Sequence, residues 1–270
     1  MQAAAFGYIQ QMVKQQAGII VEPGKEYLAE SRLGGYARDR GFATVDLFVD
    51  TLRTSPFGES HRRVIELLTT NETSFFRDVR PFEALRQTVI PKLLEARRGR
   101  NLVIWCAASS SGQEPYSVAM LLREYFPSLA ATTRIIASDI SRDMLARIRE
   151  ATYSQFEIGR GLPPTLLAKY LVTNGTNWQI RPELRAMVEP REINLAMPFP
   201  ALPTIDIVLL RNVLIYFDAA KKQDIMTRMK RVLAHDGVLM LGGAETAMGV
   251  DAGFERCSAD NKAAWYCRAR

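Results

Sequence analysis

The chain has 270 residues, 47% of them hydrophobic, and a formal net charge of +6. That length suits one large α/β domain with a small companion, and no apolar run approaches the roughly 20 residues of a membrane span, so we expect no membrane insertion. The three cysteines, Cys106, Cys257 and Cys267, cannot all pair and lack metal-hook spacing, which predicts reduced thiols, no metal and a cytoplasmic location. The positive charge favours an acidic partner, which could be nucleic acid, an anionic membrane or an acidic protein surface.

Residues 1–70 predict a small helical domain. Apolar residues with helical spacing begin near Phe6, and further helices are expected at 27–40, 45–54 and 60–69. The Gly34-Gly35 pair lowers the helix propensity of the second of these segments. Arginines give this domain a basic face, which in most proteins is only a solvated surface.

Residues 71–78 form a polar segment with two phenylalanines that bridges the helical part and the rest of the chain. A helix is expected to follow from Pro81 to Arg98. The strands that we expect all lie beyond it.

The stretch from Leu102 to Met120 reads as a buried strand, a small-residue loop and a helix. Gly112 can adopt a positive φ in this loop, which lets backbone approach a ligand closely. A dinucleotide fingerprint would place three glycines here for a pyrophosphate, whereas this loop has one glycine and an acid, Glu114. Such a loop suits a cationic ligand, and S-adenosylmethionine (SAM) carries an ammonium and a sulfonium. A βα turn without any ligand is the alternative.

The remaining elements continue an alternation of strands and helices. The strand at 134–139 ends in Asp139, which could bind ribose hydroxyls, begin the next helix, or do both. A hairpin around Asn174-Gly175 and a possible third strand at 188–193 predict a small antiparallel insertion at about 165–192. A strand at 205–210, a helix from Asp218 that ends at Asp236-Gly237, a strand at 238–241 and final antiparallel strands near 254 and 263–268 complete a doubly wound, Rossmann-like sheet.

Four segments together resemble one family. The segments are Asn71–Asp78, Ser109–Ser117, Ala137–Asp139 and Arg211–Phe217, and the resemblance spans essentially the whole chain. They resemble the CheR family, the SAM-dependent chemoreceptor glutamate methyltransferases. The resemblance implies an N-terminal all-α receptor-docking domain at 1–70 and a SAM-binding methyltransferase domain at 71–270, with 71–80 as the linker motif.

In that family the substrate is a glutamyl side chain of a methyl-accepting chemotaxis receptor, and the products are a methyl ester and S-adenosylhomocysteine (SAH). The resemblance implies that Arg77 and Tyr216 lie beside the transferred methyl and that Arg32, Arg38 and Arg40 dock the receptor. The implied cofactor contacts are Asn71, Thr73, Arg77, Ala107, Glu114, Asp139, Asn194, Leu195, Asn212 and Val213.

The turn at Thr173–Asn177 departs from the family pattern, because members that bind a receptor's C-terminal pentapeptide use a longer, glycine-rich turn. We therefore expect no pentapeptide tether, and we expect a monomer that binds no nucleic acid. Two other readings are a SAM-dependent RNA methyltransferase, against which no RNA-binding motif is found, and a non-catalytic SAM or SAH sensor.

Methyl transfer to a carboxylate requires little acid–base chemistry. A sulfonium methyl is already electrophilic, and a glutamate with a pKa of about 4.3 is ionised at pH 7, so no general base is needed. Catalysis is then mostly positioning and exclusion of water. We expect Arg77 to orient the carboxylate and Tyr216 to fix the carboxylate or the sulfonium.

Overall fold

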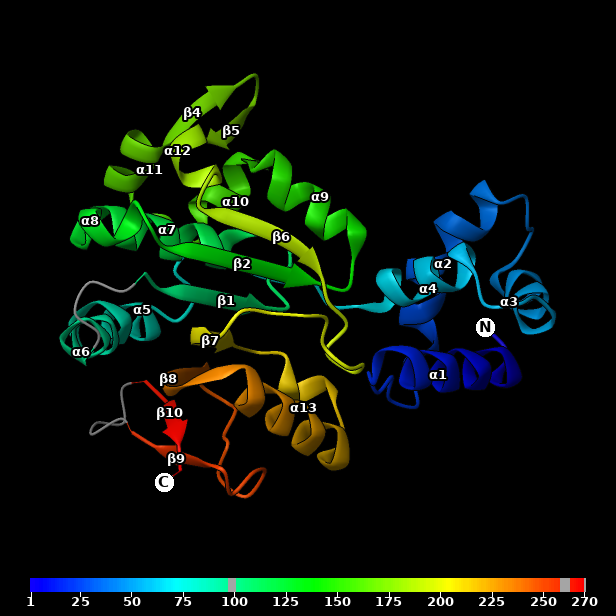
Figure 1. The fold of residues 1–270 in the computed structure, drawn as a ribbon. Coiled ribbons are helices and arrows are strands. Elements are labelled where there is room, and N and C mark those ends of the chain that lie inside the picture. Colours follow the sequence, from blue (N-terminus) through cyan, green and yellow to red (C-terminus); the bar gives the residue numbers. More distant parts are fainter. Residues whose placement is uncertain (97–100, 258–262, 270) are drawn as a thin grey trace. The chain divides into compact units, whose positions relative to one another are not determined.

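The computed structural model describes residues 1–96, 101–257 and 263–269, which fold as two compact units (Figure 1). The first unit contains Met1–Thr70 together with Leu195–Met197 and Tyr216–Lys221. The second unit contains Asn71–Asn194, Pro198–Ile215 and Lys222–Arg270. Within the described ranges, no helix has the length and apolar character needed to cross a membrane.

The first unit is built on four helices, α1 (Ala3–Ala17), α2 (Glu26–Asp39), α3 (Val45–Thr54) and α4 (Glu59–Leu68). Each helix buries one apolar face, as its sequence periodicity predicts. The helix predicted at 27–40 is observed as α2, which continues through Gly34-Gly35. Ala29, Leu33 and Ala37 on that helix are at most 1% exposed, so packing of this face outweighs the low helix propensity of two glycines.

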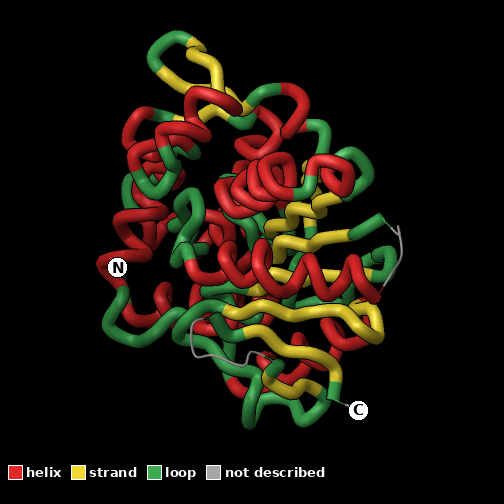
Figure 2. Tube along the Cα trace, turned by 90° about the vertical axis from the view of Figure 1, so that its left-hand side faces the viewer, coloured by secondary structure: helices red, strands yellow, loops and turns green. Residues whose placement is uncertain are grey.

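The second unit is organised around a seven-stranded sheet in the order β6-β2-β1-β7-β8-β10-β9. The first five strands in this order run parallel, β10 is antiparallel to both of its neighbours, β8 and β9, and helices flank the strands in Figure 2. This arrangement confirms the predicted doubly wound α/β class. The strands are β1 (Val103–Ala107), β2 (Arg134–Asp139), β6 (Val188–Glu192), β7 (Ile205–Leu210), β8 (Leu233–Leu241), β9 (Phe254–Arg256) and β10 (Trp265–Arg268).

The helices of this unit are α5 (Arg80–Ala84), η1 (Leu85–Val89), α6 (Ile90–Ala96), α7 (Gln113–Tyr125), α8 (Pro127–Ala130), α9 (Arg142–Glu150), α10 (Gln155–Gly159), α11 (Pro164–Tyr170), α12 (Pro182–Arg185) and α13 (Ala219–Val232), with a 3₁₀ turn η2 (Leu214–Tyr216). The main core joins alternate residues of the central strands, such as Ile104 and Cys106, to Leu85 of η1 and Val118 of α7. Trp105 points to the opposite face of the sheet, where its ring meets Phe199 at 5.2 Å.

The helix predicted at 81–98 is observed from Arg80 to Ala96, and its predicted end lies outside the described residues. Its middle turn, η1, is π-helical, and Ile90 donates to the carbonyl of Leu85. Pro91 follows directly and has no N–H to donate, so the wider turn lies where the regular helical ladder is already broken.

Two sequence-based boundaries were wrong. Residues 188–192 do not belong to the insertion, because β6 pairs in parallel with β2 at the edge of the large sheet. The third strand of the insertion is β3 (Thr152–Tyr153), beside β5 (Asn177–Ile180) and β4 (Leu171–Asn174). Helix α13 ends at Val232 rather than at Gly237, because Leu233 already pairs with Ile205 of β7.

The predicted hairpin turn is confirmed. Asn174 pairs with Asn177, which leaves a two-residue connection, and Gly175 adopts φ +60°. A glycine at this position suits the backbone twist of a two-residue β-hairpin turn.

Candidate active site

The loop between β1 and α7 lies at the carboxyl end of the parallel strands, where open α/β sheets commonly bind ligands. Ala107 ends β1 and is buried, and Ala108, Ser110 and Gly112 have φ values of +54°, +51° and +97°. The predicted positive φ of Gly112 is confirmed. Left-handed conformations are rare for residues other than glycine, so this loop is held in shape by its surroundings.

Asp139 is one of the groups that hold it. Its two carboxylate oxygens accept backbone N–H groups of Ser110 and Ser141, both at 2.9 Å. The hydroxyl of Ser110 donates to the carbonyl of Asn71 at 2.6 Å, which connects the bridging motif to the same loop. Both sequence-based roles for Asp139 are compatible with this geometry, because each carboxylate oxygen has two lone pairs.

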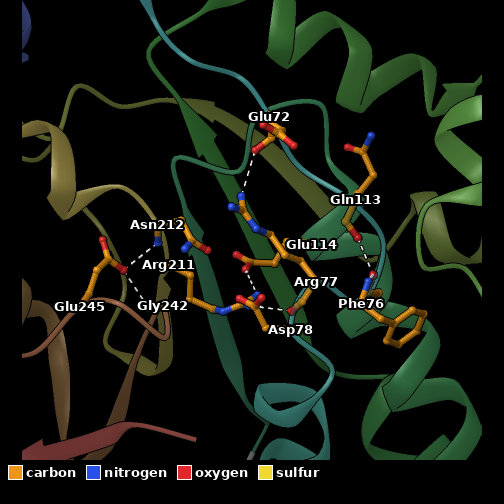
Figure 3. Close-up of polar contacts among 11 residues, drawn as sticks. Glu72, Phe76, Arg77, Asp78, Gln113, Glu114, Arg211, Asn212, Gly242 and Glu245 are labelled. Carbon is orange, nitrogen blue, oxygen red and sulfur yellow. Dashed lines mark hydrogen bonds and ion pairs between the residues drawn. The ribbon is translucent and has the colours of Figure 1, made fainter. Parts of the chain in front are cut away.

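Glu114, in the first turn of α7, lies in a buried ion cluster (Figure 3). One carboxylate oxygen is 2.8 Å from Nη1 of Arg211, whose side chain is only 2% exposed. Nη2 of Arg211 donates to Asp78 at 2.9 Å and to the carbonyl of Arg77 at 2.6 Å, and its guanidinium lies over the ring of Phe82. This cluster joins the bridging motif, the α7 N-terminus and the end of β7.

Burial raises the pKa of Glu114, and the nearby Arg211 and Arg77 oppose this rise. Burial also raises the pKa of the neighbouring Cys106 thiol well above its usual range, and the negative charge of Glu114 adds to that effect. Cys106 is therefore a protonated structural thiol. A cationic ligand group beside Glu114 would favour the ionised carboxylate.

Arg77 is half-buried and donates from Nη1 to the backbone carbonyl of Glu72 at 3.1 Å. The carboxylate of Glu72 in turn binds Arg160 at 2.7 Å. Behind this motif Gly161 has φ +90°, and a Cβ there would lie 2.1 Å from the carbonyl oxygen of Phe75. The bridging motif is therefore fastened to the loop after α10.

The turn after β7 contains Asn212, with φ +58°, and Val213. Its backbone is held by Glu245, whose carboxylate accepts the N–H groups of Asn212, Val213 and Leu214 at 2.7, 2.9 and 2.7 Å. The same carboxylate accepts the N–H of Gly242 at 2.8 Å (Figure 3).

The other predicted residues are distributed over both units. Thr73 and Asn194 are half-buried in the second unit, whereas Leu195 and Tyr216 belong to the first. Leu195 is buried, and Tyr216 is half-buried with its carbonyl accepting the N–H of Ile20 at 2.9 Å.

The three arginines predicted to dock a receptor differ in their surroundings. Arg32 donates to the carbonyls of Leu68 and Thr69 and so caps the end of α4. Arg38 and Arg40 are exposed. Sequence reasoning thus included one arginine with a clear structural task.

Three site residues were missed by sequence reasoning: Asp78, Arg211 and Glu245. The position of Arg211 carried a usable signal, because a charge directly after the apolar run of β7 needs a partner when it is buried. Glu245 carried no comparable signal, since the residues of the turn that it holds lie 31 to 33 positions away in sequence.

The arrangement fits SAM on chemical grounds. Two carboxylates, those of Glu114 and Asp139, lie at the ends of the adjacent strands β1 and β2 or just beyond them. An acidic residue in the first turn of α7 would repel a phosphate group, so the helix N-terminus does not suit a phosphate-containing ligand. Glu114 suits the ammonium of SAM and Asp139 its ribose. A mostly parallel sheet with two carboxylates placed in this way is typical of a SAM-binding methyltransferase.

Comparison with known proteins identifies the family. Residues 4–69 match the model of the CheR methyltransferase all-alpha domain, and residues 71–263 match the CheR methyltransferase SAM binding domain. The chain therefore belongs to the CheR family. Chemotaxis protein methyltransferase 1 of Pseudomonas aeruginosa is 38% identical over 247 residues, covering 90% of both chains. Cher2 of Pseudomonas putida is 37% identical over 88% of both, and the Escherichia coli chemotaxis protein methyltransferase is 31% identical over 90% of this chain and 84% of its own.

Proposed function

We propose that this protein transfers the methyl group of SAM to glutamate side chains of methyl-accepting chemotaxis receptors. The products are glutamyl methyl esters and SAH, and the reaction serves sensory adaptation. Membership of the CheR family supports this function, and the buried cluster of Glu114 with Arg211 is the structural observation that supports it most directly.

The cofactor, when bound, supplies an electrophilic methyl on a sulfonium. Glu114 would hold its ammonium, because a buried carboxylate that already has a guanidinium on one side can accept a second cation on another lone pair. Asp139 would accept the ribose hydroxyls, and Asn212 and Val213 would contact the cofactor from the turn after β7. Asn71, Thr73 and Ala107, with Asn194 and Leu195, complete the proposed contact set.

Arg77 is the proposed orienting group for the incoming carboxylate. Its guanidinium already donates to the backbone carbonyl of Glu72, so part of its hydrogen-bonding capacity is used before the substrate anion binds. Weaker pairing suits this reaction, because tight binding of the ground-state carboxylate would lower its nucleophilicity. Tyr216 is proposed to complete the arrangement by fixing the carboxylate or the sulfonium.

Arg38 and Arg40 are proposed to dock the acidic receptor surface. Both are exposed on or beside α2, whereas Arg32 is committed to the end of α4. Charge reversal at Arg38 and Arg40 should raise the KM for receptor and leave SAH affinity unchanged. Arg53→Glu, an exposed change on α3, is the matched control.

The main experiment combines methyl-labelled SAM with receptor-containing membranes, followed by mild alkali. Release of the label as volatile methanol would establish a carboxyl methyl ester. Alkali-stable incorporation would contradict the proposal and point to amine or nucleic-acid methylation, and SAM binding without incorporation into any receptor of the source organism would favour a sensor.

We also propose that the protein uses no receptor pentapeptide. The two-residue connection between β4 and β5 supports this, because it offers little backbone beyond the hairpin itself. Titration calorimetry with a receptor-tail pentapeptide should show no binding, and micromolar affinity would contradict the proposal.

A further inference from the structure

The carboxylate of Glu245 holds the backbone of the turn after β7 through several hydrogen bonds. Three consecutive N–H groups, those of residues 212–214, converge on this one carboxylate, and a fourth comes from Gly242. Neighbouring N–H dipoles that point to one place repel each other, so the arrangement needs an anion at its centre. Glu245 is 8% exposed and provides that anion from within the chain.

The turn that carries Glu245 is shaped around this contact. A Cβ at Gly242 would lie 2.7 Å from Oε2 of Glu245 and 2.8 Å from both the backbone N and the Nδ2 of Asn212. The next residue, Gly243, has open space where its Cβ would be. Glycine is therefore required at position 242, where the backbone lies against the Glu245 carboxylate, and not at position 243.

We infer that Glu245 is a positioning residue for methyl transfer. It keeps Asn212 in its left-handed conformation and presents the Asn212–Val213 turn to the cofactor, and it acts through that turn. The inference rests on the proposed cofactor contacts of Asn212 and Val213. Glu245 fixes the backbone of the turn, while Asp78 and Glu114 fix Arg211 at its start.

The test measures SAH affinity of the full chain by titration calorimetry, which needs no receptor. Glu245→Gln keeps the shape but replaces an acceptor oxygen with an amide group that faces donors, and it should weaken SAH binding at least tenfold. Glu255→Gln, on the exposed part of β9, is the control and should stay within twofold of the wild type. SAH binding by the wild type tests the cofactor site separately from this inference.

A second pair of variants tests the same contact without touching the carboxylate. Gly242→Ala should weaken SAH binding at least tenfold, and Gly243→Ala should not. If Glu245→Gln does not fold, the comparison of Gly242→Ala with Gly243→Ala still tests the inference.

The role also predicts a kinetic split. The KM for SAM should rise at least tenfold in Glu245→Gln and Gly242→Ala, with the KM for receptor unchanged, and the melting temperature should respond less to SAH than in the wild type. A lower melting temperature with SAH affinity within twofold of the wild type in Gly242→Ala would overturn the inference and leave Glu245 a purely structural residue.

Discussion

Replacement of Arg211 by methionine should destabilise the protein in a pH-dependent manner. Methionine fills similar space with an unbranched apolar chain but removes the guanidinium that pairs with the buried Glu114. Removal of one member of a buried ion pair typically costs about 3–5 kcal/mol. For a domain of this size that corresponds to a fall of roughly 6–20 °C in melting temperature.

The pH dependence follows from Glu114. Its folded-state pKa is raised above the unfolded value, mainly by burial, and Arg211 is the largest influence that opposes the rise. For a carboxyl with a raised pKa, the stability penalty is absent when both states are protonated and grows as the pH rises above about 4.3. Without Arg211 the pKa rises further, so the deficit of the variant relative to the wild type should be larger at pH 8 than at pH 5.

Urea unfolding of both proteins at several pH values between 5 and 8 provides the measurement. Arg142→Met is the control, because the pair of Arg142 with Glu192 is about half exposed on both sides and should contribute at most about 1 kcal/mol. A deficit for Arg211→Met below 1 kcal/mol, or one that does not change with pH, would refute the reasoning.

Three further outcomes are expected. Glu114→Gln should weaken SAH binding roughly tenfold to a hundredfold, as loss of one charge-assisted hydrogen bond implies, and an unchanged dissociation constant in calorimetry would exclude the ammonium role. Arg77→Ala should reduce turnover far more than SAM binding, so equal turnover in the labelling assay would remove Arg77 from the reaction. Gly161→Ala should cost at least about 2 kcal/mol in urea unfolding, because it forces a left-handed alanine toward the Phe75 carbonyl. Gly159→Ala meets open space and should change stability by less than about 1 kcal/mol; similar losses in both variants would contradict this account.

Local patterns predicted the strand and the loop at the candidate cofactor site. The apolar run before Ala107 and the small residues around Gly112 indicate a buried strand and a tight loop, and both are observed. These signals are local because they reflect burial of one strand on both faces and the φ preference of single residues.

Pairing between distant segments was harder to predict. Residues 188–192 follow a hairpin closely in sequence, yet they join the large sheet beside β2. The periodicity of a strand indicates which of its faces are buried but not which neighbouring strand supplies its hydrogen bonds. The sequence of this short strand, with a proline at 190, therefore does not indicate which of the two sheets it joins.

The residues of the candidate site show the same contrast between local signals and pairing over long distances in sequence. Glu114 and Asp139 were chosen from the sequence for their chemistry and their place near the end of a strand, and the two strands concerned, β1 and β2, are neighbours in the sheet. Arg211 meets Glu114 across 97 positions of sequence, and no single-sequence pattern encodes that meeting. Arg32 illustrates a different difficulty. It donates to the carbonyls at the end of α4, and the sequence alone does not distinguish such an arginine from one that faces a partner protein.

The helical unit is assembled from three separate stretches of chain, and one of them begins with Tyr216. Gly18, at φ +70°, lies so close to Ala196 and Phe217 that any side chain there would collide with them, and Lys14 pairs with Asp218 at 3.3 Å. A fragment cut at Thr70 would lack these partners and leave an apolar seam open to water. The tyrosine proposed to act at the methyl group therefore belongs to the same unit as the arginines proposed to dock the receptor, so both proposed roles depend on the folding of that one unit.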